Sequence, residues 1–264
     1  MEVELLDRKA SHQAKQEGYD QFMLQKLPLK KLVVELRYKP ELSFYGKMDS
    51  IGLELADDFP DWQRSPLTLE VRNKKKHRRL FLSYDRAFLD MDEADPDGDF
   101  SRAEKLLRTV CSQLAVKEFL RIGVRQWFAA DLDKPFALIV DEFAERFLPK
   151  KAELATILND KTKDVAYVVD YETTEGWRYN LRMGPMMKSQ WFLVVAHEPN
   201  CYEQGDDNEE TFAKFRQSFP EQFLYFDIDC YKEDQPPDKL DKFLASVRRR
   251  SHDLATKLIE YCKK

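Results

Sequence analysis

The densest charge in the sequence is a cationic run at residues 72–79, with the letters RNKKKHRR. Residues 67–71 and 80–84 on either side have the residue types of strands, so the segment predicts a β-hairpin with a basic tip. Like charges gathered at an exposed tip suit phosphates or the acidic surface of a partner, although lysines at hairpin tips also serve only to deter edge-to-edge aggregation. The candidate binding residues are Lys74, Lys75, Lys76, Arg78 and Arg79.

A second candidate is the acidic segment of residues 93–104, which matches part of the EF-hand pattern for calcium. Positions 1, 3, 5, 6 and 12 of that pattern fall on Glu93, Asp95, Asp97, Gly98 and Glu104. The first position holds Glu rather than Asp, and a strand-like segment precedes the loop where an EF-hand has a helix. Turn chemistry and a capping box of Ser101 and Glu104 explain the same residues without an ion. We therefore expect no metal site here, and we expect Ser101 to cap the following helix.

Two aspartates form a third candidate. Asp227 and Asp229 are two residues apart in a strand-like segment, residues 223–231, so both should lie on one face of the strand. Such a pair is suited to holding a metal ion in a hydrolase or nuclease, which is the alternative function for this chain. No lysine follows in the arrangement that is usual for nucleases, and this favours a half-exposed polar face instead.

The sequence lacks the common motifs of nucleotide-dependent and metal-dependent enzymes. Its eight glycines are isolated from one another, so it has neither a P-loop nor the dinucleotide-binding GxGxxG. The four histidines share no metal-ligand spacing. No CxxC pair occurs, and scattered cysteines are typical of reduced thiols in a cytoplasmic protein: Cys111, Cys201, Cys230 and Cys262. We predict no cofactor and no metal, assign no catalytic residue, and favour a protein that is not an enzyme.

Composition indicates a folded chain in the cytoplasm. Of the 264 residues, 43% are hydrophobic and 12% are aromatic, which is enough for a packed core. The first residues lack the basic and apolar regions of a secretory signal, and no apolar run approaches the ~20 residues that span a bilayer. The formal net charge of −5 does not favour bulk binding of nucleic acid. These features predict a cytoplasmic protein that does not contact a membrane.

Hydrophobic periodicity predicts an α+β fold, with antiparallel-rich sheets and helices on one face. Strand-like segments cover residues 32–38, 67–71, 80–84, 86–91, 119–129, 165–171, 177–183, 191–196 and 223–231. Helical segments cover residues 44–57, the stretch from 101 onward, residues 135–147, a stretch around Phe212 and Phe215, and a long segment after Pro236. Both types of element therefore occur in both parts of the chain.

The order of these elements suggests an internal duplication. After an N-terminal arm of residues 1–26, the halves 27–149 and 150–264 are each expected to contain a strand-strand-strand-helix-strand-helix unit. Residues 118–124 and 222–228 are also similar in sequence. Because the connecting residues 150–164 are few and are not rich in glycine, we expect the two halves to form one packed unit.

Two of these strands carry a family resemblance. Residues 27–38, LPLKKLVVELRY, resemble the opening strand of a sporadically distributed prokaryotic family of uncharacterised proteins of about this length. Residues 120–125, LRIGVR, are similar to that family's central strand, although RQWF at 125–128 departs from its usual Arg-Tyr-Ile-Asn continuation. The strand-then-helix layout from Tyr225 to Tyr261 is also similar. The resemblance implies no activity and no catalytic residues, and the patchy distribution of the family implies an accessory or defence-associated role.

The sequence thus predicts a binding or interaction protein that uses the basic hairpin tip. The expected partner is a protein or another acidic surface, and nucleic acid is the alternative partner. The oligomeric state does not follow from the sequence.

Overall fold

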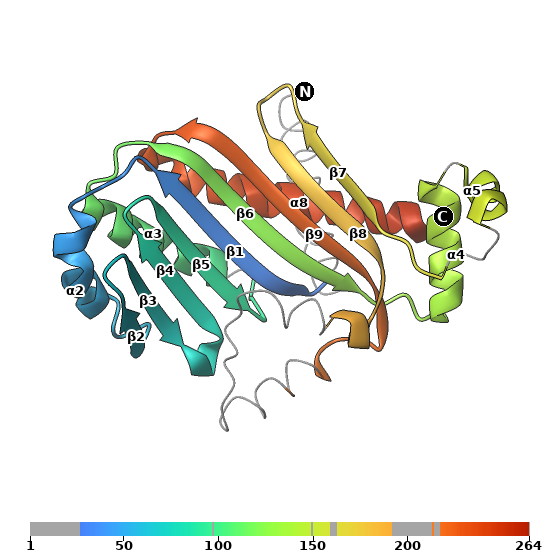
Figure 1. Ribbon diagram of the computed structural model, residues 1–264, viewed down its shortest axis with the longest axis horizontal. Helices are drawn as coiled ribbons and strands as arrows, with labels where there is room; N and C mark the ends of the chain where they lie inside the picture. The colour runs from blue at the N-terminus through green and yellow to red at the C-terminus, as the bar shows by residue number, and fades with distance from the viewer. Residues whose placement is uncertain are drawn as a thin grey trace, which may run out of the picture.

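The computed structural model describes residues 27–96, 98–148, 150–158, 163–191, 213 and 217–263. These residues form a nine-stranded sheet in the order β2-β3-β4-β5-β1-β6-β9-β8-β7 (Figure 1), and every neighbouring pair is antiparallel. The strands are β1 Leu29–Tyr38, β2 Asp61–Arg64, β3 Thr68–Asn73, β4 Arg78–Ser83, β5 Arg86–Asp92, β6 Phe119–Ala130, β7 Tyr167–Glu172, β8 Arg178–Met187 and β9 Gln222–Gln235.

The main helices lie behind this sheet in Figure 1, so one face is covered and the other faces the viewer. The described helices are α2 Phe44–Glu54, α3 Gly98–Leu114, α4 Phe136–Phe147, α5 Lys151–Leu158 and α8 Leu240–Lys263, with 3₁₀ turns at Lys74–Lys76 and Pro237–Lys239. The longest, α8, packs against β6, β9 and α3, and α4 packs against β8 and β9. The α+β fold class predicted from the sequence is confirmed.

Alternating side chains explain why helices cover one face. In β1, Leu32, Val34 and Leu36 are fully buried in the main hydrophobic core, whereas the residues that alternate with them include Glu35 and Arg37. Successive side chains of a strand point to opposite faces, so the apolar set faces the helices and the charged set faces away from them. The same core extends from β1 to α8, and the described residues therefore pack as one unit.

The strand order is symmetric about the central pair β1 and β6. Outward from β1 come β5, β4, β3 and β2, and outward from β6 come β9, β8 and β7. In each series the first strand in sequence lies at the centre, the last strand lies beside it, and a helix, α3 or α8, follows that last strand. This symmetry is consistent with a duplication whose boundary falls between α3 and β6.

The repeating unit in the sheet differs from the expected strand-strand-strand-helix-strand-helix unit. It consists of a strand, a helical segment, a group of strands and a final helix. The strand β6 and helix α4 belong with the second series, although the sequence places them in the half that ends at residue 149. The connecting residues 150–164 contain α5 rather than only a linker.

Most expected elements occur within a few residues of their predicted bounds. The sequence patterns do not indicate β2 or α5; the residues of β2 are all exposed and so carry no alternation of buried and polar side chains. Trp191, the first residue of one expected strand, lies in a helical turn. The N-terminal arm of residues 1–26, residues 192–196, Phe212 and Phe215 lie outside the described residues. No described helix is both long and apolar enough to cross a membrane.

Candidate binding surface

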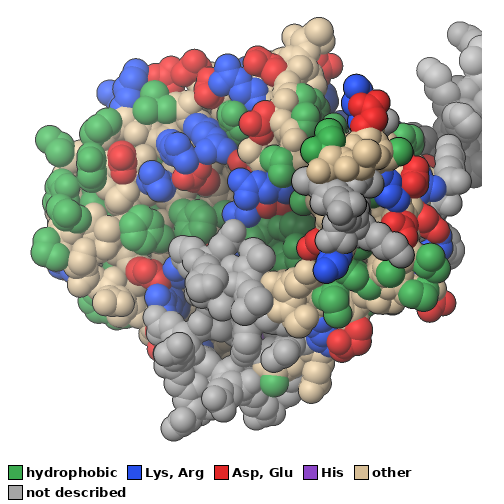
Figure 2. Space-filling model, turned by 45° about the vertical axis from the view of Figure 1, so that its right-hand side comes forward, with side chains coloured by type: hydrophobic (Ala, Val, Ile, Leu, Met, Phe, Trp, Pro, Cys, Tyr) green, Lys and Arg blue, Asp and Glu red, His purple; other side chains and the backbone are tan. Residues whose placement is uncertain are grey.

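The sheet face away from the main helices, here called the open face, carries charged and aromatic side chains. Figure 2 views this side obliquely and shows Lys and Arg side chains next to Asp and Glu side chains across it. On the central strands the ion pairs gather around three carboxylates, those of Glu35, Asp227 and Asp229. The arginines that bind these carboxylates were not identified from the sequence.

Three arginines from neighbouring strands surround Glu35. Its carboxylate oxygens lie 3.0 Å from Arg37 Nη2, 3.6 Å from Arg86 Nε and 3.2 Å from Arg121 Nη1. In the antiparallel register Arg37 is directly opposite both Arg86 on β5 and Arg121 on β6, so the three guanidinium groups come from one row of the sheet. We call these four residues the Glu35 cluster. It contains three positive charges and one negative charge.

Arg121 links the Glu35 cluster to β9. Its Nη2 donates to Asp229 Oδ2 at 2.7 Å, and its guanidinium lies 4.2 Å from the centroid of the Tyr231 ring. Gly123, in the middle of β6, leaves the space for this stack, because a Cβ there would lie 3.3 Å from the Cβ of Tyr231 and 3.6 Å from Arg121 Nε. Burial raises the pKa of Asp229, and the neighbouring Arg121 opposes that shift.

Asp227 is held by Arg125 in a two-pronged ion pair. Arg125 Nε and Nη2 donate to the two carboxylate oxygens of Asp227 at 2.8 and 2.7 Å, and the guanidinium lies 4.9 Å from the Trp127 ring centroid. Asp227 and Asp229 share one face of β9, as predicted, because both contact arginines of the open face of β6. Within the described ranges, no three His, Cys, Asp or Glu side chains lie together as metal ligands. The two aspartates are therefore occupied by arginines in this structure.

The cationic run forms the tip of the β3–β4 hairpin, as predicted. Lys74, Lys75 and Lys76 form an exposed 3₁₀ turn, which we call the lysine tip. Buried residues anchor it on both sides. The side chain of Asn73 accepts a hydrogen bond from the backbone N–H of Lys76 at 3.1 Å, and His77 adopts a left-handed backbone with φ of 50°. The lysine tip is thus held in a defined position on the sheet.

Two of the five candidate binding residues are not part of this exposed tip. Arg78 binds Asp99 at the start of α3, with Nη2 2.5 Å from Oδ1. Arg79 is only 8% exposed; it lies 3.7 Å from oxygens of Glu70 and of Asp90. The strand β4 begins at Arg78, so these side chains alternate across a paired strand instead of extending into solvent. The structure therefore assigns both arginines to internal ion pairs.

The acidic segment before α3 serves as a helix cap. Asp95 Oδ2 accepts a hydrogen bond from the backbone N–H of Gly98 at 3.0 Å, where α3 begins. Ser101 lies inside the helix, so the expected cap at that residue is wrong. Glu104 binds Arg108, one turn further along the helix, at 2.9 Å. Asp97, the central residue of the expected EF-hand match, lies outside the described residues.

A buried ion cluster lies at the other end of the open face. Lys31 Nζ is 2.6 Å from Asp90 Oδ1 and 2.9 Å from Asp92 Oδ1, and all three residues are at most 5% exposed. Burial raises the pKa of Asp90 to about 6, against the opposing effect of Lys31. The sequence signal for this cluster is a pair of alternating acids on β5 and a lysine on β1. The signal can be interpreted only when the register that places Lys31 opposite Asp92 is known.

The described cysteines are buried and free of disulfides: Cys111, Cys230 and Cys262. Burial raises the pKa of the first two thiols to about 12 and that of Cys262 to about 11. Since the thiolate is the reactive form, these thiols are inert near neutral pH. Cys201 lies outside the described residues.

The comparisons with known proteins assign no family. No family model matches the chain, and no curated protein matches it. Among solved structures, Methanococcus jannaschii TBP is similar over 76% of this chain and 87% of that chain, with 8% sequence identity and a TM-score of 0.28. A sequence identity and a TM-score this low support no conclusion about function.

Proposed function

We propose that this chain is a binding protein whose open face docks the acidic surface of a partner protein. The observation that carries the proposal is the row of Arg86, Arg37 and Arg121 around the carboxylate of Glu35. Like charges directly opposite one another across strands repel, and Glu35, together with Asp229 on Arg121, offsets only part of that repulsion. Carboxylates of a partner would offset the rest, and guanidinium groups bind carboxylates through two parallel hydrogen bonds.

Exposure and packing support this role for the Glu35 cluster. The side chains of Arg37 and Arg86 are 43% and 45% exposed, so a partner can reach them. Arg121 is only 20% exposed and is already held by Glu35 and stacked on Tyr231. A side chain that is fixed before binding loses little freedom when the partner arrives. Arginine and aromatic residues are also the types enriched at protein interfaces.

The lysine tip is the second part of the proposal. The side chains of Lys75 and Lys76 are exposed and make no ion pair with any part of the chain that the structure describes. In a chain with a net charge of −5, such a tip is a local positive field that can speed the approach of an acidic partner. The tip adjoins the Asp92 end of β5, whereas Arg86 lies at the other end of that strand. The tip would therefore steer the partner, and the Glu35 cluster would hold it.

Nucleic acid is the alternative partner, and the lysine tip is the feature that would favour it. A nucleic-acid complex loses affinity steeply as salt rises, because binding releases counterions from the phosphates. An acidic protein that is steered by the tip should instead show a slower association at high salt and a smaller change in dissociation. No observation on the described residues favours a metal-dependent hydrolase over these two binding functions.

The test begins with the partner that co-purifies with the tagged chain and is identified by mass spectrometry. Its affinity is then measured for wild type and for the double variant Arg37→Glu with Arg86→Glu. We expect a loss of about tenfold or more, because two charge-assisted contacts become repulsive. The neutral pair Arg37→Gln with Arg86→Gln should show a smaller loss, and it covers the case in which charge reversal beside Glu35 disturbs folding.

The matched control reverses two arginines away from the open face, Arg64 and Arg249. Arg64 pairs with Asp49 of α2, and Arg249 is exposed on α8. This control carries the same change in net charge and should bind the partner as wild type does. Equal affinities for wild type and for both cluster variants, with unchanged melting temperatures, would contradict the proposal.

A further inference from the structure

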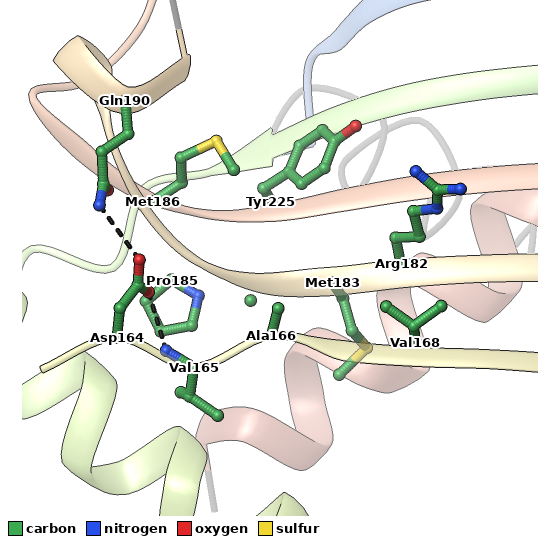
Figure 3. A pocket seen from close by; sticks show the side chains of 11 residues that line it. Asp164, Val165, Ala166, Val168, Arg182, Met183, Pro185, Met186, Gln190 and Tyr225 are labelled. Atoms are coloured by element: carbon green, nitrogen blue, oxygen red, sulfur yellow. Dashed lines mark hydrogen bonds between the residues drawn. The ribbon is translucent and has the colours of Figure 1, made fainter. Parts of the chain in front are cut away.

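A separate cavity opens on the sheet at the β7–β8 edge. Its volume is about 470 Å³, within the range of ~300–1,000 Å³ that is usual for small-molecule sites. Most of its lining is apolar, and the lining side chains come from β7, β8, β9, the segment before β7 and the helical turn after β8: Asp164, Val165, Ala166, Val168, Arg182, Met183, Pro185, Met186, Gln190 and Tyr225. Figure 3 shows these side chains around the opening.

Gly184 on β8 allows the segment before β7 to lie close to β8 at the cavity. A Cβ at this residue would lie 2.6 Å from the backbone oxygen of Val165 and 3.3 Å from the Cα of Ala166. Only glycine therefore lets the segment before β7 pass so near β8. Val168, which follows on the edge strand β7, is 61% exposed at the cavity. An exposed β-branched side chain beside an apolar cavity gains free energy when a ligand covers it.

The two ends of the cavity differ in charge. Asp164 lies at one end, where its Oδ2 accepts a hydrogen bond from Gln190 Nε2 at 3.1 Å (Figure 3). Arg182 and Tyr225 lie toward the other end (Figure 3). The apolar residues separate the two ends, so the cavity has one positive end, an apolar middle and one acidic end.

Arg182 supplies the positive charge at the rim of this cavity. Its cross-strand neighbour is Asp227, but both oxygens of Asp227 are already engaged by Arg125. As a result, the guanidinium of Arg182 makes no ion pair or hydrogen bond with any residue that the structure describes. The other arginine on this face of β8, Arg178, binds Glu172 and Glu233 instead. Arg182 is exposed at the rim of the apolar cavity, so its guanidinium is accessible to a ligand with the opposite charge.

We propose that this cavity binds a small organic monocarboxylate with an apolar body. The carboxylate would pair with Arg182 in the two-pronged geometry that guanidinium groups favour, on the side where Tyr225 lies. The apolar body would cover Val168 and Met186. Asp164 would repel the acid at the far end, and this fixes the direction in which the ligand lies.

The test uses 2-naphthoate as the probe, with titration calorimetry on the full chain. Two matched compounds separate the contributions: 2-naphthalenemethanol has the apolar body without the charge, and acetate has the charge without the body. We expect saturable binding of 2-naphthoate and binding about tenfold or more weaker for each matched compound. Acetyl-Ala-Phe and its C-terminal amide provide a further arm, since a peptide carboxyl terminus has the same chemistry as a free acid. Tighter binding of the peptide acid than of 2-naphthoate would identify a peptide as the source.

Two variants and one control locate the site. Arg182→Met should weaken 2-naphthoate about tenfold and leave 2-naphthalenemethanol unchanged, because only the charged contact is lost. Ala166→Leu should weaken both compounds by filling the cavity. Arg178→Met, four residues away on the same face of β8 but paired with Glu172 and Glu233, should bind as wild type. Absence of saturable binding to wild type, or equal loss in Arg178→Met and Arg182→Met, would overturn the proposal. Neither result depends on the partner that docks on the Glu35 cluster.

Discussion

Replacing Asp227 by Ala should destabilise the fold by about 2 kcal/mol, because the change removes the two-pronged ion pair with Arg125. The estimate follows from burial. Breaking a fully buried ion pair costs about 3–5 kcal/mol, and an exposed pair contributes about 0–1 kcal/mol. The side chain of Asp227 is 5% exposed and that of Arg125 is 30% exposed, so the pair lies between these limits. Both hydrogen bonds of the pair are short, at 2.8 and 2.7 Å.

Equilibrium urea unfolding at pH 7 measures this cost, and a double-mutant cycle with Arg125→Ala isolates the interaction. The two single changes should each destabilise the fold, and the double change should cost less than their sum by about 1–2 kcal/mol. Additive effects of the two changes would refute the inference that Asp227 serves to hold Arg125. Unchanged stability of Asp227→Ala would also refute it. Asp227 would then again be a candidate for metal binding in a hydrolase or nuclease.

Three further predictions concern a cap, a buried acid and a glycine. Asp95→Ala should cost about 1 kcal/mol in urea unfolding through loss of the α3 cap, whereas Ser101→Ala should change stability by less than half of that; equal costs would contradict the assignment of the cap. Since burial raises the pKa of Asp90 to about 6 from its ordinary value of 3.8, the folded state keeps a proton that the unfolded state has lost. Wild-type stability should therefore fall relative to Asp90→Asn by about 2–3 kcal/mol as pH rises from about 4 to about 7, and a parallel pH dependence of the two proteins would contradict it. Gly123→Val should destabilise the fold by about 1–3 kcal/mol, because the new side chain meets Tyr231; a stabilised variant would show that the stack has room to move.

Much of the fold was predictable because it depends on local patterns. The alternation of apolar and polar residues in β1, and the apolar stripe of α8, are visible in the sequence without knowledge of the partner strands. The hairpin at the lysine tip follows from two strand-like segments with a charged turn between them. Edge elements such as β2 escaped prediction because all of their side chains are exposed, which leaves no periodic signal.

The Glu35 cluster was not predictable, because its geometry depends on register. Arg37, Arg86 and Arg121 are separated in sequence, and only the pairing of β1 with β5 and β6 brings them into one row. The same limit explains why Arg79 was expected at the exposed tip. A run of cations in the sequence does not show which side chains alternate into the sheet, and Arg79 lies in a paired strand. The unpaired state of Arg182 likewise depends on which arginine engages Asp227.

The most direct test of the docking surface is arginine footprinting with and without the recovered partner. Phenylglyoxal modifies accessible guanidinium groups, and mass spectrometry then quantifies the modification of each arginine. We predict that the partner protects Arg37 and Arg86, which are 43% and 45% exposed in the free chain, and leaves Arg249 on α8 as reactive as before. Protection of Arg249 with unchanged modification of Arg37 and Arg86 would place the partner on the helical side and contradict docking on the open face.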